Sequence, residues 1–197
     1  MSLSPTPPDP SDDIQNLMFT SIAPSTLCIY QYNTHGAHEV HHSILNDPVM
    51  EHFDLLMIQE PYTYTLDNSQ VPTALSHHKL HLILLDSLTE TMEKLRAIIY
   101  VNLNVLSTLY QVIPFPSCNI TALSFSLPTH SSNFTFINIY NPPSTFSTFE
   151  KLEQFILSHP CCSPDSPFVI MGNFNLHHAL WNDPMCSHLE HQRWRPY

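Results

Sequence analysis

The residues best suited to chemistry follow an apolar run near the C-terminal end of the sequence. Phe168–Met171 stops at Gly172, and two amides one residue apart, Asn173 and Asn175, come next. A bounded run of this length predicts a strand buried on both faces, and open α/β sheets bind ligands just beyond such strands. The segment therefore predicts an active-site edge, and an Asx-type turn after a strand is the alternative.

Three further polar side chains stand where other predicted strands end. Glu60 follows the run that begins at Phe53, and a carboxylate in this place can help hold a hard divalent cation such as Mg²⁺. Asn33 ends the run from Leu27 and could lie beside Glu60. Tyr140 precedes two prolines that fix the path of the chain. The alternatives are a solvated strand end for Glu60, a turn residue for Asn33 and a core tyrosine for Tyr140.

The order of these positions resembles that of the endonuclease/exonuclease/phosphatase superfamily, a group of metal-dependent phosphodiesterases and phosphomonoesterases. Gly172-Asn173-Phe174-Asn175 resembles the family's glycine-aspartate-phenylalanine-asparagine motif. The earlier motifs also match in order: the strand ending in Asn33, then Gln59-Glu60-Pro61, then Ile139-Tyr140-Asn141-Pro142-Pro143. The resemblance extends from about Leu27 to Trp181 and implies hydrolysis of a DNA phosphodiester with Mg²⁺, or alternatively Mn²⁺, as cofactor.

The resemblance also implies a role for each matching residue. Glu60 would be the principal metal ligand, with Asn33 beside it in contact with the metal shell or the phosphate. Tyr140 would approach the scissile phosphate, and the amide of Asn175 would donate a hydrogen bond to a phosphate oxygen. Asn173 stands where the family has the aspartate that positions and activates water, and an amide carries no charge and accepts no proton at neutral pH. Catalysis is therefore expected to be impaired.

Three further residues resemble the branch found in LINE-type retrotransposons, where this domain accompanies a reverse transcriptase. Asn175 is followed by the pair His177 and His178 and then by Trp181. In that branch both histidines, and Arg96 at the start of a predicted strand, would face the nucleic acid. A lone arginine is more often a surface charge.

The family's late serine-aspartate-histidine motif is not present before Tyr197. The resemblance therefore implies a domain that is truncated at its C-terminus and lacks the last strand of one sheet. It also implies that the absence of the aspartate-histidine pair impairs catalysis further. We expect an exposed sheet edge, which a protein partner could cover.

The composition limits the classes of protein to consider. Six Lys and Arg against 17 Asp and Glu give a net charge of −11, which offers DNA no general attraction. Five cysteines without a framework spacing favour a reduced, intracellular setting, and no run is long enough to span a membrane. With 2 Gly against 18 Pro, turns that need positive φ must fall to Asn, Asp or strained residues.

The pattern predicts one α+β domain, residues 25–197, after a flexible Pro- and Ser-rich leader, residues 1–24. Its elements are strands separated by two helices, His38–Met50 and Phe146–Leu157. The resemblance selects a two-sheet, DNase I-like sandwich among the α+β arrangements. The other predicted strands are Leu27–Tyr32, Phe53–Gln59, Leu80–Leu85, Arg96–Val101, Ile120–Leu127 and Phe134–Tyr140.

Two functions other than DNA hydrolysis stay open from the sequence. The acidic balance and the histidine pairs permit a non-catalytic remnant that acts as an interaction or metal-binding module. A phosphatase for a small phosphorylated substrate is the third hypothesis. Zinc binding by a histidine cluster is disfavoured because helical spacing splits the cluster over two faces and no carboxylate or thiol completes it. That cluster consists of His35, His38, His41 and His42.

Overall fold

The computed structural model describes residues 26–66, 71–84, 94–115, 117–126, 133–143, 145–162 and 166–175. Four predictions concern parts of the chain outside these residues: the leader, the roles of the pair His177 and His178, the match at Trp181, and the missing last strand. None of the described helices is long and apolar enough to cross a membrane.

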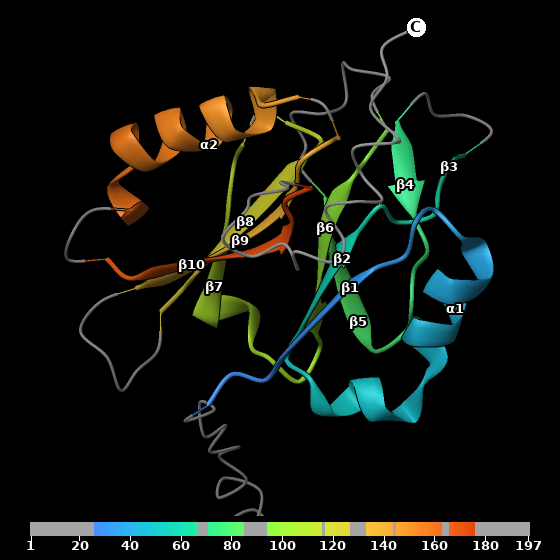
Figure 1. Cartoon of the computed structure of the whole chain (residues 1–197). Coiled ribbons are helices and arrows are strands. Elements are labelled where there is room, and N and C mark those ends of the chain that lie inside the picture. Colours follow the sequence, from blue (N-terminus) through green and yellow to red (C-terminus); the bar gives the residue numbers. More distant parts are fainter. Residues whose placement is uncertain are drawn as a thin grey trace, which may run out of the picture.

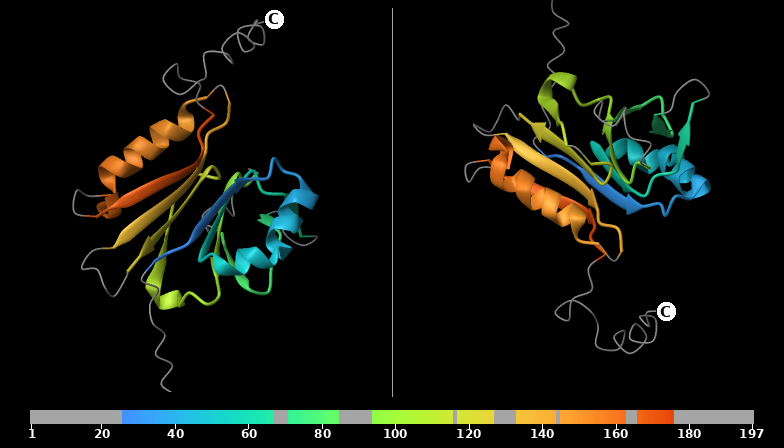
Figure 2. Two further views of the ribbon diagram at one scale, coloured as in Figure 1. Left: turned by 60° about the horizontal axis from the view of Figure 1, so that its bottom comes forward. Right: turned by 90° about the horizontal axis from the view of Figure 1, so that it is seen from above.

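Two four-stranded sheets pack face to face, with one helix on the outer side of each (Figure 1). The views in Figure 2 show α1 (His38–Asn46) and α2 (Ser147–Ser158) on opposite sides of the molecule. This arrangement confirms the predicted two-sheet α+β sandwich. The first sheet has the order β1 (Ile29–Asn33), β2 (Leu55–Gln59), β6 (Ala97–Asn102), β5 (Leu80–Ile83), and the second β10 (Phe168–Asn173), β9 (Phe134–Tyr140), β8 (Ile120–Phe125), β7 (Tyr110–Ile113).

Each sheet contains one pair of parallel strands that is connected through a helix. β1 leads through α1 to β2, and β9 leads through α2 to β10. Within each pair the carboxyl ends lie at the same edge, and in α/β sheets this edge is where ligands bind. The sequence did not predict the short strands β3 (Thr63–Thr65) and β4 (Pro72–Ala74), which form a separate pair, or β7.

The first helix is shorter than predicted. It ends at Asn46 because Pro48 cannot continue the helical hydrogen bonding. Asp47 accepts a hydrogen bond from the backbone N–H of Val49, at 2.9 Å, and so begins a separate 3₁₀ turn, Pro48–His52. Two other 3₁₀ turns, Ser107–Leu109 and Pro160–Cys162, were also not predicted.

The layer between the sheets is apolar along most of its length and polar at one end. Leu55 and Met57 of β2 pack there with apolar residues of β6, β8 and β9. The next inward position on β2 is Gln59, whose Nε2 donates to Asn138 Oδ1 of β9 at 2.6 Å. Asn138 Nδ2 in turn lies 3.1 Å from the carbonyl oxygen of Ile58 and 2.8 Å from that of Ile98. Asn138 thus joins the two sheets through a fully satisfied buried amide.

The strand Phe168–Asn173 is only half-buried along its whole length, so the predicted burial on both faces is wrong. The physical reason is its position, because β10 pairs with β9 and forms the edge of its sheet in the described part of the chain. The sequence pattern cannot distinguish an apolar edge strand from a central one.

Candidate active site

The alternation of side chains along the strands places three predicted site residues, Asn33, Tyr140 and Asn173, at the polar end of the layer between the sheets. Ile29 of β1 and Met171 of β10 pack into this layer. Because side chains alternate in direction along a strand, Asn33 and Asn173 are the last positions of their strands on the same faces. Asn173 pairs in register with Tyr140, and Asn33 pairs with Gln59.

Asn33 and Glu60 contact one another directly. Asn33 Nδ2 donates to Glu60 Oε2 at 3.1 Å, while Asn33 Oδ1 accepts the backbone N–H of His35 at 2.8 Å. The second bond fixes the orientation of the amide, because a flipped amide would present its NH₂ group to a backbone N–H. Asn33 therefore donates to the Glu60 carboxylate through its nitrogen, and its oxygen has a second lone pair that could accept a further hydrogen bond.

Three polar contacts fix the backbone of Glu60. Its N–H donates to the carbonyl of Arg96 at 2.8 Å. Its carbonyl accepts the N–H of Gly36 at 2.7 Å and the hydroxyl of Thr34 at 2.6 Å. These bonds hold Glu60 at φ 45°, in the left-handed region that a side chain disfavours by roughly 1–3 kcal/mol.

Backbone strain is concentrated at this end of the molecule. The non-glycine residues with positive φ in the described part of the chain are His35, Glu60 and Asn175. Asn is one of the residue types that the shortage of glycine led us to expect at positive φ, and His35 and Glu60 are strained residues of the kind also expected. Strained backbone that the surrounding contacts hold in place is common at functional sites.

Tyr140 lies between charged groups of opposite sign. Its side chain is buried, and the Arg96 guanidinium carbon lies 5.4 Å from the centre of its ring. Burial raises the pKa of the Tyr140 hydroxyl, and the neighbouring Glu60 carboxylate raises it further, whereas Arg96 opposes both. Tyr140 is therefore held as the neutral phenol, a hydrogen-bond donor, next to Glu60.

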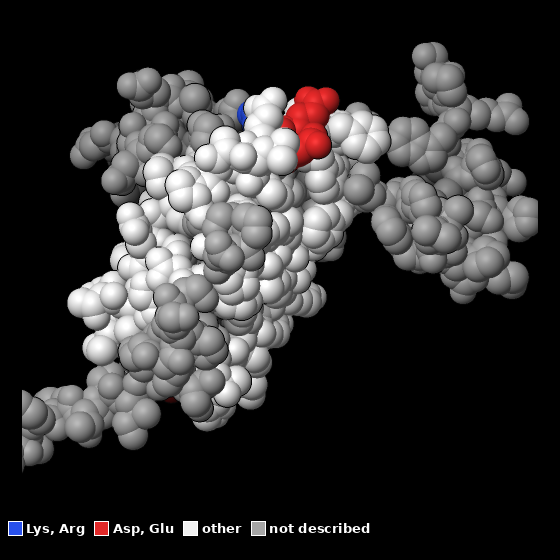
Figure 3. Space-filling model, turned by 90° about the vertical axis from the view of Figure 1, so that its left-hand side faces the viewer, with Lys and Arg blue, Asp and Glu red and all other residues white. Residues whose placement is uncertain are grey.

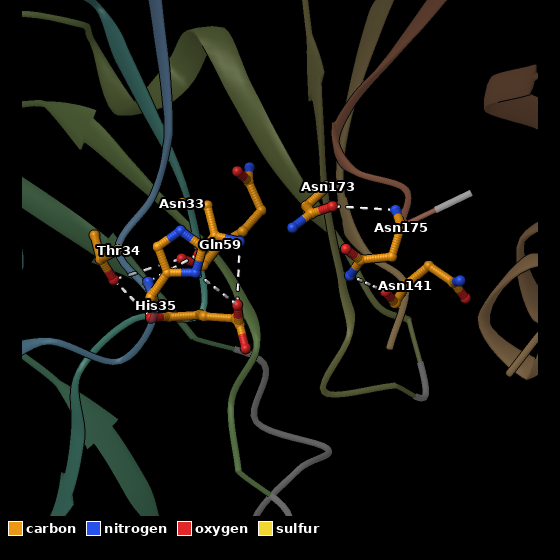
Figure 4. Close-up of polar contacts among 8 residues, drawn as sticks. Asn33, Thr34, His35, Gln59, Asn141, Asn173 and Asn175 are labelled. Carbon is orange, nitrogen blue, oxygen red and sulfur yellow. Dashed lines mark hydrogen bonds and ion pairs between the residues drawn. The ribbon is translucent and has the colours of Figure 1, made fainter. Parts of the chain in front are cut away.

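The second polar group consists of three asparagines on the other sheet. Asn173 Oδ1 accepts the N–H of Asn175 at 3.1 Å, and the Asn173 carbonyl accepts the N–H of Asn141 at 2.8 Å. Asn175 Nδ2 donates to the Asn141 carbonyl at 2.6 Å, which uses one of its two N–H bonds. Figure 4 shows this group on one sheet and Asn33, Thr34, His35 and Gln59 on the other.

The structure thus brings Asn33, Glu60, Arg96 and Tyr140 into one neighbourhood, with Asn173 and Asn175 on the adjoining strand end.

Two residues of the site were not singled out from the sequence. Asn141 is buried, and its Oδ1 has no hydrogen-bond partner among the described residues. His35 was considered only for zinc, although its Nδ1 lies 3.6 Å from Glu60 Oε2. For Asn141, an amide directly after the β9 run was the available signal.

The donor set fits a hard divalent cation better than zinc. Mg²⁺ is commonly held by one or two carboxylates, with waters and substrate phosphates completing its shell. Glu60 supplies one such carboxylate, and its side chain is 26% exposed. Within the described ranges, no three His, Cys, Asp or Glu side chains group as metal ligands, as a zinc centre would require.

No protein-family model matches the chain, and no curated protein matches it. Among solved structures, it is similar to the endonuclease domain of TRAS1, a telomere-specific non-LTR retrotransposon, with a TM-score of 0.55 and 14% identity. That match covers 84% of this chain and 68% of the other. A humanized D. rerio TDP2 with 14 mutations gives a TM-score of 0.46 and 13% identity over 86% of this chain and 79% of the other. The similarity to the TRAS1 domain shows that the chain has a DNase I-like fold, as predicted.

Proposed function

We propose that this chain is a metal-dependent phosphodiesterase of the retrotransposon-endonuclease kind, which acts on DNA and whose activity is limited by the amide of Asn173. The observation that carries the proposal is the grouping of Asn33, Glu60 and Tyr140 at the polar end of the layer between the sheets. The match to an endonuclease domain in fold supports the choice of DNA as substrate.

Each side chain of the site has a role that its contacts support. Glu60 would hold Mg²⁺, or alternatively Mn²⁺, and Asn33 would keep the carboxylate oriented through their 3.1 Å hydrogen bond. The cation would supply charge stabilisation at the phosphate. Tyr140, as a neutral phenol, would donate a hydrogen bond to a phosphate oxygen. Asn175 would donate through the N–H bond that its contact with Asn141 leaves available.

Asn173 explains why we expect slow turnover. Its oxygen accepts the N–H of Asn175, so its position is well defined, but it cannot take a proton from water. General base assistance is typically worth about 10²- to 10⁴-fold in rate. A chain without it retains positioning and charge stabilisation only.

A plasmid-nicking assay with the full chain and Mg²⁺ tests this function. We expect slow nicking that Glu60→Gln abolishes, because the amide keeps the shape of the side chain and removes its charge. Glu153→Gln, at an exposed position on α2, is the matched control and should nick like the parent chain.

The outcomes separate the three functional hypotheses. An absence of nicking at high protein concentration, with both Mg²⁺ and Mn²⁺, would support a non-catalytic interaction or metal-binding module. Glu60-dependent release of phosphate from a panel of small phosphate esters, without nicking, would support a phosphatase. If no nicking is found, a protein partner bound at the edge of β10 would be consistent with the interaction module.

A further inference from the structure

The chain is acidic overall, yet half of its described Lys and Arg residues contact either Glu60 or the turn that is hydrogen-bonded to it. The described part of the chain contains four such residues: Lys79, Lys94, Arg96 and Lys151. The net charge of −11 repels a polyanion at long range, but salt screens charges beyond about 8–10 Å. The cations that directly adjoin the bound phosphates therefore decide whether nucleic acid binds.

Lys94 is held over the turn that carries His35. Its Nζ lies 3.3 Å from the place that a Cβ of Gly36 would occupy. Gly36, at φ 72°, donates its N–H to the carbonyl of Glu60, so the ammonium group lies one residue contact from Glu60. The absence of a side chain at Gly36 gives the Lys94 ammonium this place.

Arg96 contacts Glu60 directly through its backbone. Its carbonyl accepts the Glu60 N–H, and its guanidinium lies over the Tyr140 ring. Neither Lys94 nor Arg96 forms an ion pair with a carboxylate in the described ranges, whereas Lys79 pairs with Glu51 at 2.5 Å. Two cations near Glu60 that pair with no carboxylate of the described residues are available for an anionic ligand.

The surface over α2 lacks such a pair of neighbouring cations in the described residues. Figure 3 shows a face that is mostly uncharged, with acidic side chains gathered at one edge. α2 carries the exposed residues Glu150 and Glu153, next to exposed apolar residues such as Phe146. This face offers a phosphate chain no comparable attraction.

We propose that Lys94 and Arg96 form a two-cation contact for consecutive phosphates of a DNA strand, which holds that strand against Glu60. The inference rests on the proposed function and adds Lys94 as a substrate-binding residue of the site. Lys94 would act as a point charge, and the Arg96 guanidinium, oriented by Tyr140, would make a directed contact.

The salt dependence of DNA binding tests the contact. All variants would be made in the full chain with Glu60→Gln, so that neither cleavage nor metal binding by Glu60 affects the result. Binding to a short fluorescein-labelled duplex would be followed by fluorescence anisotropy between 50 and 200 mM salt. We expect Lys94→Gln to make the slope of log K against log salt shallower by about 0.9, and Arg96→Gln to act similarly. Each should weaken binding roughly tenfold at the low-salt end.

Lys79→Gln and Lys151→Gln are the matched controls. The backbone carbonyl of Lys79 accepts the N–H of Leu103, which follows the end of β6 and lies roughly 20 Å along the strand from Arg96. Lys151 is exposed on α2. Both controls should leave the slope unchanged.

An unchanged slope in Lys94→Gln, an equal change in a control, or no DNA binding by the parent at low salt would overturn the two-cation contact. These results are distinguishable from failure of the proposed function. Glu60-dependent nicking with an unchanged slope would reject the contact alone. A shallower slope in a chain that does not nick would keep the contact and reject the hydrolase.

Discussion

At the scale of single residues, the site combines well-defined geometry with a missing charge. Asn173 keeps the hydrogen bond to the N–H of Asn175 that an aspartate would also make. Its nitrogen occupies the place of a second carboxylate oxygen. On the proposed function, the part of the impairment that comes from Asn173 lies in one atom and its charge, so we expect a single substitution to reverse that part.

We expect Asn173→Asp to raise the rate of Mg²⁺-dependent nicking by about 10²- to 10⁴-fold, the usual contribution of a general base. The new carboxylate can keep the bond to the Asn175 N–H and gains the ability to accept a proton. Initial rates from the plasmid assay would measure the change.

Asn175→Asp is the control, because it adds the same charge two residues away. It removes the donor to the Asn141 carbonyl and places a carboxylate against that oxygen. We expect it to lower both the activity and the stability. An equal gain in both variants would show that charge alone, and not the position of Asn173, sets the rate.

At the scale of secondary structure, the site depends on how closely β10 approaches β9. A Cβ on Gly172 would lie 1.9 Å from the carbonyl oxygen of Ile139, and Gly172 has φ 144°. The clash is with a backbone atom, which cannot move aside as a flexible side chain can, and the dihedral angle is one that residues with a side chain rarely adopt. The strand end that carries Asn173 therefore requires glycine immediately before it.

The two glycines of the chain allow a matched comparison of stability. We expect Gly172→Ala to lower the free energy of unfolding by about 3 kcal/mol or more, through the clash with Ile139. Gly36→Ala meets only the end of the Lys94 side chain and should lose about 1 kcal/mol through its left-handed φ. Urea unfolding would measure both. Equal losses would contradict the close approach of β10 to β9.

Most of the helices and longer strands could be predicted from the sequence, whereas the shortest strands could not. Strands that end in a polar residue, such as those leading to Asn33, Glu60 and Tyr140, carry a strong apolar pattern and were predicted near their true ends. The short strands β3 and β4 have too few residues for a pattern, and they depend on pairing with one another. Local patterns do not report such pairing.

The polar contacts between the two sheets could also not be predicted from the sequence. Asn138 lies between two isoleucines in a predicted strand, which signals a buried amide with specific partners. Those partners, Gln59 and two backbone carbonyls on the first sheet, are 40 to 80 positions away in the chain. The same separation hides the contact of Lys94 with Gly36. The candidate site could therefore be predicted by its residues, but not by the contacts that orient them.

At the scale of the whole molecule, the fold buries a titratable group outside the site. His41 of α1 is completely buried, and its Nε2 lies 3.0 Å from the hydroxyl of Tyr100. The Tyr100 hydroxyl donates to the carbonyl of Leu75 at 2.5 Å. Because that hydroxyl has one proton, His41 Nε2 must be the donor in their contact, and Nδ1 carries no proton in the neutral ring.

This burial predicts how the stability of the whole fold depends on pH. Burial lowers the pKa of His41 to about 4, mainly by desolvation, with the backbone of Tyr62 opposing and His38 adding to the effect. An unfolded histidine has a pKa of about 6.5. Since the folded pKa is lower, the unfolded chain binds the proton first as the pH falls. The stability contributed by neutral His41 is therefore complete above about pH 6.5 and decreases progressively toward pH 4, by ~3 kcal/mol in total.

We expect His41→Phe to remove this part of the pH dependence, because phenylalanine fills a similar volume and leaves the Tyr100 hydroxyl its bond to Leu75. Urea unfolding of the parent and the variant at intervals from pH 7 to pH 4 would measure it. His42→Gln, at an exposed position on the same helix, should retain the full dependence of the parent. If His41→Phe and the parent lost stability in parallel as the pH fell, protonation of His41 would not be what destabilises the fold in acid, and the other titrating groups would account for the loss.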